Sequence, residues 1–307
     1  MTSAVVVTWE GGDTTRRCVA SLLAQDAPLG RIVVVDNASS DAERASLRAA
    51  WAGESRVDVV LLDDNRQFAG GMNAGAAHAF GAGAMRVLFL NNDTVLAPDA
   101  VRLLGSALDA TPGAGIAGPR VVDRADPSHV LSAGERHALP ILCLPRTLLR
   151  YRRPLDRPYA VRGVMGCALL VTRECFQAVD GFSTDIEVYY EDVDFCLGAR
   201  AAGFGIVVEP RAVVAHDGLR GFAAGLSPWA AFLKARNPWL LVRHRGTWAV
   251  WPAFVPTYAA MLASSAALYA LRGRGDIVRA FGRGALAGVR VALGGAPAPV
   301  GAPRRVA

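Results

Sequence analysis

Short apolar runs alternate with amphipathic stretches along the first third of the chain. Ala4–Thr8 is a mostly β-branched run, which is typical of a buried parallel strand. A Gly-Gly turn follows it, and then Asp13, a candidate helix cap. The predicted strands are Ala4–Thr8, Arg31–Val35, Val57–Leu62 and Arg86–Leu90, and the predicted helices lie at about 13–24, 43–51, within 68–83 and 99–109. This alternation predicts a doubly wound α/β fold with a mostly parallel sheet flanked by helices.

The middle of the chain is less regular. Further strands are predicted at 115–122, 164–172, 205–209 and 212–215, with helices at 173–179 and 189–202. Residues 123–158 are rich in proline and arginine and show weak periodicity, so we expect an excursion near the active site or the acceptor.

The C-terminal part has a different pattern. Thr247–Leu271 contains no charged residue, although Pro252 and Pro256 interrupt it. It is long enough to span a bilayer, and its pattern also fits a helical hairpin, an interfacial helix, a buried helix or a dimer interface. The following stretch carries arginines at helical spacing, namely Arg272, Arg279, Arg283 and Arg290. The sequence therefore predicts an apolar, basic helical tail.

Composition and charge narrow the classes of function. Hydrophobic residues make up 52% of the 307 residues and charged residues 20%, which excludes intrinsic disorder. From residue 228 onward the net charge is +10, whereas the preceding part carries −4. This asymmetry argues against a uniformly basic nucleic-acid binder and favours attachment of the tail to an anionic membrane surface.

The cysteines and the N-terminus bear on the compartment. Five cysteines without a C-x-x-C pair indicate reduced, buried thiols rather than a disulfide framework or a zinc site. The N-terminus has no basic and apolar leader pattern, so we expect no signal peptide and a protein that stays in the cytoplasm.

Polar residues follow several of the predicted strands. Asp36, Asn65 and Asp93 lie at or just beyond strand ends, where α/β sheets bind ligands. Asp36 suits a ribose hydroxyl or a base N–H, and Asp93 suits a divalent metal. Asp93 also suits a turn or helix cap, which is the commoner role of such an aspartate.

A second group of acids opens the helix predicted after residue 189. Glu191, Asp192 and Asp194 crowd one turn between aromatic residues, as a general base beside a metal would. The alternative is a solvated first turn whose acids the helix dipole favours. His216 ends a β-branched run and is either a structural histidine or a further metal ligand.

The stretch 65–75 is rich in glycine, which allows the backbone to approach a ligand closely. It is not a G-x-G-x-x-G after a first strand and not a Walker loop, so a dinucleotide fold and a P-loop are both disfavoured.

Seven segments stand in a defined order along residues 4–245. They are VVVTWEGG, VVVDNASSD, NRQFAGGMNAG, LFLNNDT, GCALLVTRECFQAVDGFST, YYEDVDFCLGARAAGFG and VVAHDGLRG. Together they resemble the family-2 glycosyltransferases with the A-type (GT-A, Rossmann-like) fold, and above all the rhamnosyltransferase-like branch that builds bacterial cell-surface polysaccharides.

The resemblance implies a role for each matching position. Asp192 matches the catalytic base, with Glu191 and Asp194 in the same motif. Asp93 ends the D-x-D-like motif and implies a Mg²⁺ or Mn²⁺ ligand, which His216 joins in some relatives. Gly166 and Cys167 lie in the segment that lines the acceptor side. The nucleotide-sugar side comprises Thr8, Glu10, Asp36, Asn65, Gly70, Gly71, Asn73, Asn91 and Asn92.

The chain also departs from the family pattern. Glu10 stands where relatives have an amide close to the nucleotide, Asn91 occupies the first place of the D-x-D motif, and Met72 replaces a common asparagine. The proposed metal ligand and the proposed base are both retained.

The resemblance implies an inverting glycosyltransferase that moves a sugar, with rhamnose favoured, from a dTDP- or UDP-sugar to a cell-surface or lipid-linked glycan. A nucleotidyltransferase and a non-catalytic sugar- or nucleotide-binding scaffold are the alternatives. We expect a catalytic domain over 1–227, with a nucleotide-sugar half at 1–122 and an acceptor half at 123–227. A membrane-associating tail over 228–296 and a disordered end over 297–307 would follow, with the protein peripheral to, or anchored at, the cytoplasmic face of the cell membrane.

Overall fold

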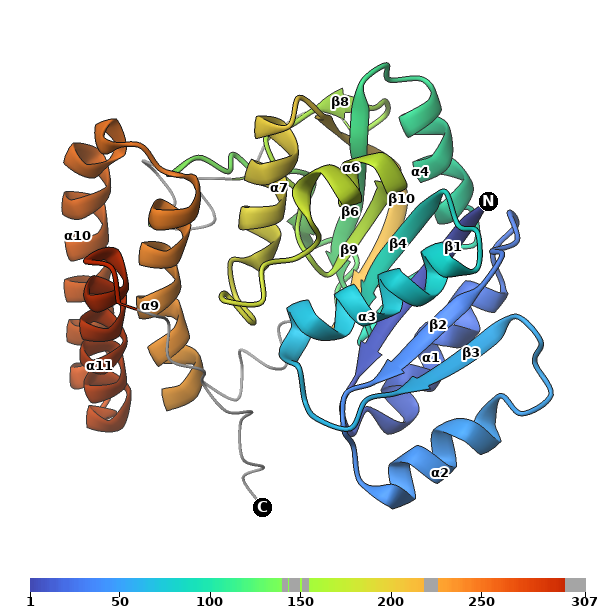
Figure 1. The fold of residues 1–307 in the computed structure, drawn as a ribbon, viewed down its shortest axis with the longest axis horizontal. Coiled ribbons are helices and arrows are strands. Elements are labelled where there is room, and N and C mark those ends of the chain that lie inside the picture. The colour runs from blue at the N-terminus through green and yellow to red at the C-terminus, as the bar shows by residue number, and fades with distance from the viewer. Residues whose placement is uncertain (140–142, 144–149, 151–154, 218–225, 296–307) are drawn as a thin grey trace.

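The computed structural model describes residues 1–139, 143, 150, 155–217 and 226–295. The N-terminal part alternates strands and helices as predicted (Figure 1). Its elements are β1 (Thr2–Thr8), α1 (Gly12–Leu23), β2 (Ile32–Asp36), α2 (Asp41–Ala50), β3 (Val57–Leu61), α3 (Gln67–Gly81) and β4 (Arg86–Asn91). The expected disorder at 297–307 and most of residues 140–154 lie outside the described residues.

The remaining elements complete the sheet and add a helical tail. They are β5 (Thr94–Leu96), α4 (Ala100–Asp109), β6 (Ala114–Asp123), β7 (Val130–Ser132), β8 (Tyr159–Ala160), β9 (Ala168–Thr172), α6 (Arg173–Val179), α7 (Glu191–Ala201), β10 (Gly205–His216), α9 (Pro228–Arg245), the 3₁₀ helix η2 (Trp248–Val250), α10 (Trp251–Leu271) and α11 (Gly275–Ala292).

Within the described residues the strands form one sheet in the order β3-β2-β1-β4-β9-β6-β10-β5. The β1, β2, β3 and β4 ladders are parallel, and so is the β6–β10 pair. β9 runs antiparallel between β4 and β6. The start of β9 therefore meets the carboxyl end of β4, where the candidate residues gather.

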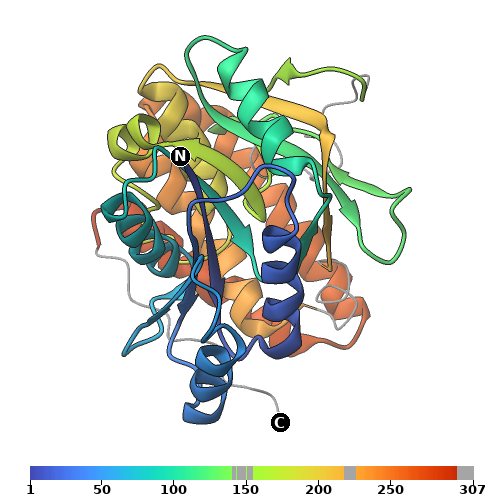
Figure 2. The ribbon, with the colours of Figure 1, turned by 90° about the vertical axis from the view of Figure 1, so that its right-hand side faces the viewer.

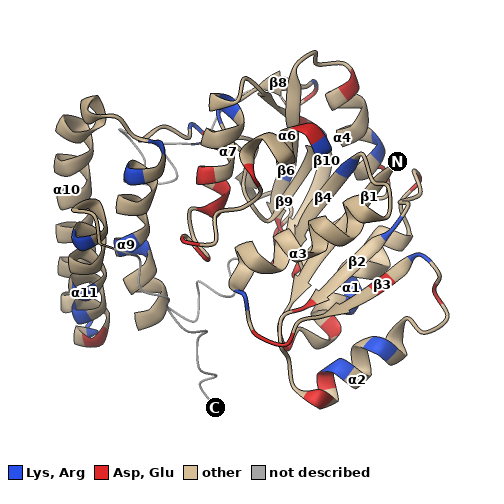
Figure 3. Ribbon diagram, in the orientation of Figure 1, with Lys and Arg blue, Asp and Glu red and all other residues tan. Residues whose placement is uncertain are grey.

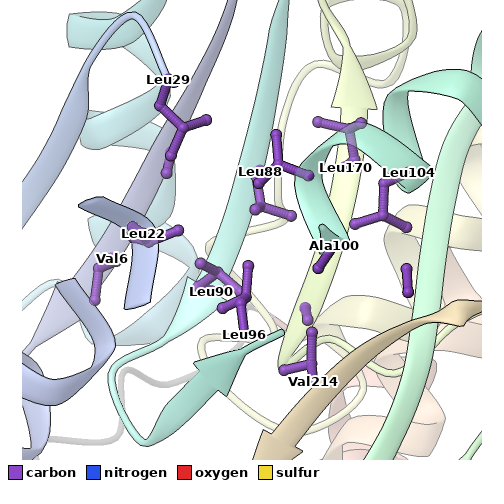
Figure 4. Close-up of a cluster of buried hydrophobic side chains, with 14 of the residues drawn as sticks. Val6, Leu22, Leu29, Leu88, Leu90, Leu96, Ala100, Leu104, Leu170 and Val214 are labelled. Carbon is purple, nitrogen blue, oxygen red and sulfur yellow. The ribbon is translucent and has the colours of Figure 1, made fainter. Parts of the chain in front are cut away.

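Alternation along the strands fills both faces of the sheet. Val6 packs with Leu22, Leu88, Leu90 and Leu104 against α1 and α4 (Figure 4). Its neighbour Val5 points to the opposite face. There it joins a cluster with α3, α6 and α7 that includes Met72, Phe89, Phe182 and Phe195. The departure at Met72 is thus a fully buried core residue. α3 approaches β1 so closely that a Cβ on Gly75 would lie 2.3 Å from Val5 Cγ1.

Several predicted helix starts differ from the structure by one or two residues, and two of the differences have a clear physical reason. Asp13 does not cap α1, because the cap position is Gly11 and Asp13 lies in the first turn, where it pairs with Arg16. α7 begins at Glu191 rather than at residue 189, because Tyr189 and Tyr190 adopt left-handed backbone angles.

The helices after the sheet pack as a separate layer. α9 lies between α7 and the outer helices α10 and α11 (Figure 1), and the layer stands behind the sheet in Figure 2. An aromatic cluster joins α9 to α10, in which the Trp239 ring lies 5.2 Å from that of Phe254 and 5.0 Å from that of Tyr258. Ile277 and Phe281 of α11 pack against Ala231 and Ala235 of α9.

Candidate active site

The carboxyl ends of β1, β2 and β4 meet at one edge of the sheet. The register places Thr8 beside Asp36 and Val7 beside Asn91. Asn92 Nδ2 donates to Thr8 Oγ1 at 3.3 Å and to Thr15 Oγ1 at 3.1 Å. Three residues predicted on the nucleotide side, Thr8, Asn91 and Asn92, therefore lie at the same edge of the sheet as the carboxyl end of β2.

Glu10 supports the neighbouring loop. Its backbone is left-handed, with φ at 53°. Both of its carboxylate oxygens accept from Ser40, one from the backbone N–H at 2.8 Å and one from the hydroxyl at 3.2 Å. The Glu10 N–H donates to Ser39 Oγ. Glu10, the acid at the position of the expected amide, thus links the end of β1 to the loop after β2 by hydrogen bonds.

Asp36 is completely buried. Its Oδ2 accepts from Arg44 Nε at 3.0 Å and from the Ser39 N–H at 3.2 Å. Its Oδ1 accepts no hydrogen bond in the described structure. Arg44 thereby balances the buried charge and leaves one carboxylate oxygen for a further donor.

The glycine-rich segment forms the first turns of α3. Asn65 Oδ1 accepts from the Gln67 N–H at 2.9 Å. A Cβ on Gly70 would lie 2.6 Å from Arg66 Cβ, and one on Gly71 would lie 2.9 Å from Val7. Asn73 uses both ends of its amide on the backbone of Phe182, at 2.8 and 2.9 Å. Asn73 therefore joins α3 to the segment before α7 and does not face the nucleotide side.

Asp93 lies in the turn after β4 and His216 lies at the end of β10, and their side chains meet. His216 Nε2 lies 3.1 Å from Asp93 Oδ1 and 3.5 Å from Asn91 Nδ2. Asp93 Oδ1 is buried and accepts no well-aligned hydrogen bond. An orphaned carboxylate oxygen beside an imidazole fits two ligands of a divalent cation. In the described part of the chain no group of three or more such side chains gathers, so a cation here needs further ligands from a substrate.

The acids of α7 lie next to the start of β9. Asp192 Oδ2 accepts from the Gly166 N–H at 2.8 Å, and its Oδ1 accepts from the Val193 N–H at 2.8 Å. A Cβ on Gly166 would lie 2.7 Å from Asp192 Cβ, so only glycine allows this approach. Cys167, the next residue, accepts the Asn91 N–H on its carbonyl at 3.0 Å. Asp192 and the turn that carries Asp93 are thus joined through Gly166 and Cys167. Glu191 and Asp192 are both 8% exposed.

Asp194 has a different environment from Asp192. Its side chain is fully buried, and both oxygens accept from Arg245, from Nε and NH2, each at 2.8 Å. This bidentate hydrogen bond raises the pKa of Arg245. Asp194 therefore joins α7 to the end of α9 and is not placed to take a proton from a substrate.

Sequence reasoning missed three residues of α9 that support the site, Arg236, Asn237 and Arg245. Arg236 is 1% exposed and Asn237 is fully buried. Their sequence signal was weak, because α9 also carries Lys234, Arg243 and His244, and helical periodicity assigns such polar residues to a solvated face.

Comparison with known proteins places this chain in a family. Residues 3–179 match glycosyl transferase family 2. The N-acetylglucosaminyl-diphospho-decaprenol L-rhamnosyltransferase of Mycobacterium tuberculosis is 31% identical over 271 residues, which cover 80% of this chain and 85% of that protein. The dTDP-rhamnosyl transferase RfbF of Shigella flexneri is 25% identical over 224 residues, 69% of this chain and 70% of that protein.

A solved structure shares the fold. The mannosyltransferase PcManGT of Pyrobaculum calidifontis, in complex with GDP-Man and Mn²⁺, superposes with a TM-score of 0.58 at 20% identity, covering 94% of this chain and 86% of that one. The predicted GT-A fold is thereby confirmed. The match to the family model covers more than half of the chain. It favours a glycosyltransferase over a nucleotidyltransferase or a non-catalytic binding scaffold. The chain belongs to glycosyl transferase family 2.

Proposed function

We propose that the protein transfers a sugar from a nucleoside-diphosphate donor to a glycan acceptor by single displacement, with Asp192 as the base. The observation that carries this proposal is the link from Asn91 through Cys167 and Gly166 to Asp192, which joins the turn of Asp93 to Asp192. Two carboxylates from separate elements then serve the leaving group and the acceptor hydroxyl. One base on the face opposite the leaving group inverts the anomeric centre.

Asp93 and His216 would hold a Mg²⁺ or Mn²⁺ ion together with the donor diphosphate. Such a cation, when bound, supplies Lewis-acid stabilisation of the leaving diphosphate. The Oδ1 of Asp93, which is buried, accepts no well-aligned hydrogen bond and lies 3.1 Å from His216 Nε2, supports this assignment. The solved mannosyltransferase with the same fold contains Mn²⁺, which also supports a divalent ion.

The nucleotide would lie over the ends of β1 and β2. Asp36 Oδ1 is free to accept the N3–H of a thymine or uracil. Because the Asp36 side chain is completely buried, a base reaches this oxygen only after neighbouring side chains move. The names of the two rhamnosyltransferase relatives favour dTDP-rhamnose as donor and a lipid diphosphate-linked glycan as acceptor.

A thermal-shift panel tests the donor class. The protein is heated with dTDP, UDP, GDP or CDP, each with Mn²⁺, Mg²⁺ or EDTA. We expect a metal-dependent rise with dTDP, because a ligand at 100 times its dissociation constant adds about 2.7 kcal/mol to the free energy of unfolding. A larger rise with GDP would contradict a thymine or uracil nucleotide as donor, and equal rises with metal and with EDTA would contradict the metal site.

The outer helices would attach the protein to the cytoplasmic face of the membrane, where a lipid-linked acceptor lies. One helical segment of the described chain, Trp248–Leu271, is long and apolar enough to span a bilayer, and 11% of its most apolar window is buried. α10 carries no charge along its length in Figure 3. Exposed apolar side chains continue onto α11 at Leu286 and just beyond it at Leu293, and α11 also exposes Arg279 and Arg283. Apolar side chains next to arginines fit an anionic lipid surface.

Vesicle flotation tests this attachment. The double variant Leu268→Glu/Leu271→Glu should weaken binding to anionic vesicles at least about tenfold, because each leucine contributes about 1.5–3 kcal/mol on burial. Both leucines are exposed, at 45% and 88%, so the fold should be unaffected. Leu155→Glu, at an exposed leucine outside the tail, is the matched control. Wild-type protein that stays in the aqueous fraction at low and high salt would contradict membrane attachment.

A further inference from the structure

The segment that leads into α7 has an unfavourable backbone. Glu187, Tyr189 and Tyr190 adopt φ angles of 62°, 63° and 74°, in the left-handed region that non-glycine residues avoid. They directly precede Glu191 and Asp192. Three such residues within four positions cost free energy, and they persist only where the surrounding structure holds them. The contacts of the segment Asp185–Tyr190, the pre-α7 loop, therefore decide where Asp192 lies.

Asn237 of α9 holds this loop through its main chain. Its Nδ2 lies 3.0 Å from Ile186 O and 2.9 Å from both Val188 O and Tyr189 O. The three carbonyls converge on one fully buried amide group. The amide group carries two hydrogens, so two of the three carbonyls share one of them. Buried carbonyls are costly without a donor, so this side chain supports the loop at the point where its backbone is strained.

Arg236 orients the Asn237 amide. Its Nε donates to Asn237 Oδ1 at 2.9 Å, which directs the amide nitrogen toward the loop carbonyls. Its NH2 reaches Asp185 O at 3.3 Å and Glu187 Oε2 at 3.4 Å. Burial lowers the pKa of Arg236, and the nearby Glu187 carboxylate opposes this shift. Arg236 is thus a buried charge that hydrogen-bonds to Asn237 and to the pre-α7 loop.

The pre-α7 loop reaches both halves of the site. The Ala69 N–H of α3 donates to Glu187 O at 3.1 Å, on the nucleotide side. The Asp194 N–H donates to Tyr190 O at 2.9 Å, and the Asp194 side chain binds Arg245. α9 therefore contacts the chain on both sides of Asp192. Asn237 binds the loop before it, and Arg245 binds Asp194 after it.

We infer that Arg236, Asn237 and Arg245 are positioning residues for the transfer, which hold the carboxylate of Asp192 in the geometry that accepts the acceptor proton. They act through the pre-α7 loop and Asp194 and touch no reacting atom. This inference rests on the proposed function of Asp192. Burying a guanidinium and an amide costs free energy that an apolar face on α9 would not cost. The polar groups are therefore better explained by their role in fixing the loop conformation than by a contribution to stability.

The test compares Asn237→Leu, which keeps the size of the side chain and removes its donors, with Ile277→Ala. Ile277 is fully buried between α9 and α11 and belongs to a cluster without residues of the pre-α7 loop, so its variant loosens the same layer without touching the site. Turnover is measured as dTDP released from dTDP-rhamnose with N-acetylglucosaminyl-diphospho-decaprenol. Asn237→Leu should lower kcat ten- to a hundredfold and leave the Kd for dTDP with Mn²⁺ within about twofold. Ile277→Ala should lower the melting temperature and leave kcat unchanged.

Hydrogen–deuterium exchange provides a readout that does not depend on activity. Amides of the 186–194 segment should exchange at least tenfold faster in Asn237→Leu and at the wild-type rate in Ile277→Ala. If Asn237→Leu does not fold, Asn237→Ser, which retains one donor, should show the same changes to a smaller extent. Unchanged exchange and unchanged kcat in a folded variant would overturn the inference.

A double-mutant cycle separates this inference from the proposed function. In an Asp192→Asn background, Asn237→Leu should cause less than a threefold further loss of turnover, because the group it positions is already absent. Full additivity of the two losses would overturn the positioning role. If Asp192→Asn alone leaves turnover near the wild-type value, the proposed function of Asp192 fails, whatever the exchange data show.

Discussion

The variant Asp192→Asn is expected to lower kcat by about two to four orders of magnitude, the usual contribution of a general base. The carboxylate accepts two backbone N–H groups, from Gly166 and Val193, which fix its place beside the start of β9. Asparagine keeps the shape of the side chain but cannot take a proton from the acceptor. Steady-state turnover with saturating donor and acceptor is the measurement.

Donor binding and folding are the controls for this variant. The amide loses one of the two backbone hydrogen bonds, so its melting temperature is compared with that of the wild type. The Kd for dTDP with Mn²⁺ should stay within a few-fold. Glu174→Gln, an exposed carboxylate in the first turn of α6, should keep full turnover. Near-normal turnover of Asp192→Asn would remove this residue from the role of base.

The variant Asp93→Ala should weaken the binding of a nucleoside diphosphate in the presence of Mn²⁺ by about 10- to 100-fold and leave binding in EDTA unchanged. Loss of a ligand should cost at least as much as loss of an outer-shell partner of a metal site, which is about 10- to 100-fold. The reason is that Asp93 is the anionic member of the pair with His216, whose Nε2 lies 3.1 Å from Oδ1. Titration calorimetry with and without the metal measures both affinities.

Asp99→Ala is the matched control, because Asp99 is a partly exposed aspartate directly before α4, on the same segment of chain. It should leave both affinities unchanged. An Asp93→Ala protein with the wild-type difference between Mn²⁺ and EDTA would exclude Asp93 as a ligand. Loss of affinity in EDTA as well would indicate that the turn after β4 has collapsed.

The N-terminal half of the fold was predictable because local signals agree there. Runs such as Val5–Val7 and Val33–Val35 fit a strand that is buried on both faces, and they form one parallel ladder. The polar residues after such runs necessarily meet at one edge of the sheet. The positions of Asp36, Asn91 and Asp93 therefore followed from the pattern, and the resemblance to a family supplied the roles.

The strand β9 was predicted, within 164–172, but its antiparallel direction was not predictable from its sequence. An apolar run such as Ala168–Thr172 has the same composition in either direction, and its neighbours β4 and β6 are set by tertiary packing. The contact between Gly166 and Asp192 depends on that arrangement. Sequence reasoning could name both residues, but it could not explain why one of them must be a glycine.

The contribution of α9 was hidden for a different reason. Arg236 and Arg245 counted as part of a basic tail, because charge is normally solvated. Their partners, Glu187 and Asp194, are 49 and 51 positions away in sequence. The left-handed backbone angles of Tyr189 and Tyr190 leave no signal in the local sequence. Ion pairs between residues so far apart in the sequence leave none either. The division of the chain at residue 227 remains a prediction, and contacts of the site cross it.

The way Asn237 holds the pre-α7 loop has a consequence for evolution. Its partners are main-chain carbonyls, which every amino acid carries, so support of the loop does not depend on most of the loop's side chains. Ile186 is fully buried and so is constrained, whereas Asp185 is exposed and Val188 is partly exposed. Mutation at the latter two positions can therefore reshape the surface beside the site while the backbone is retained. Asn237 itself has no such freedom, and selection for a new specificity would act on the loop while sparing the helix that carries it.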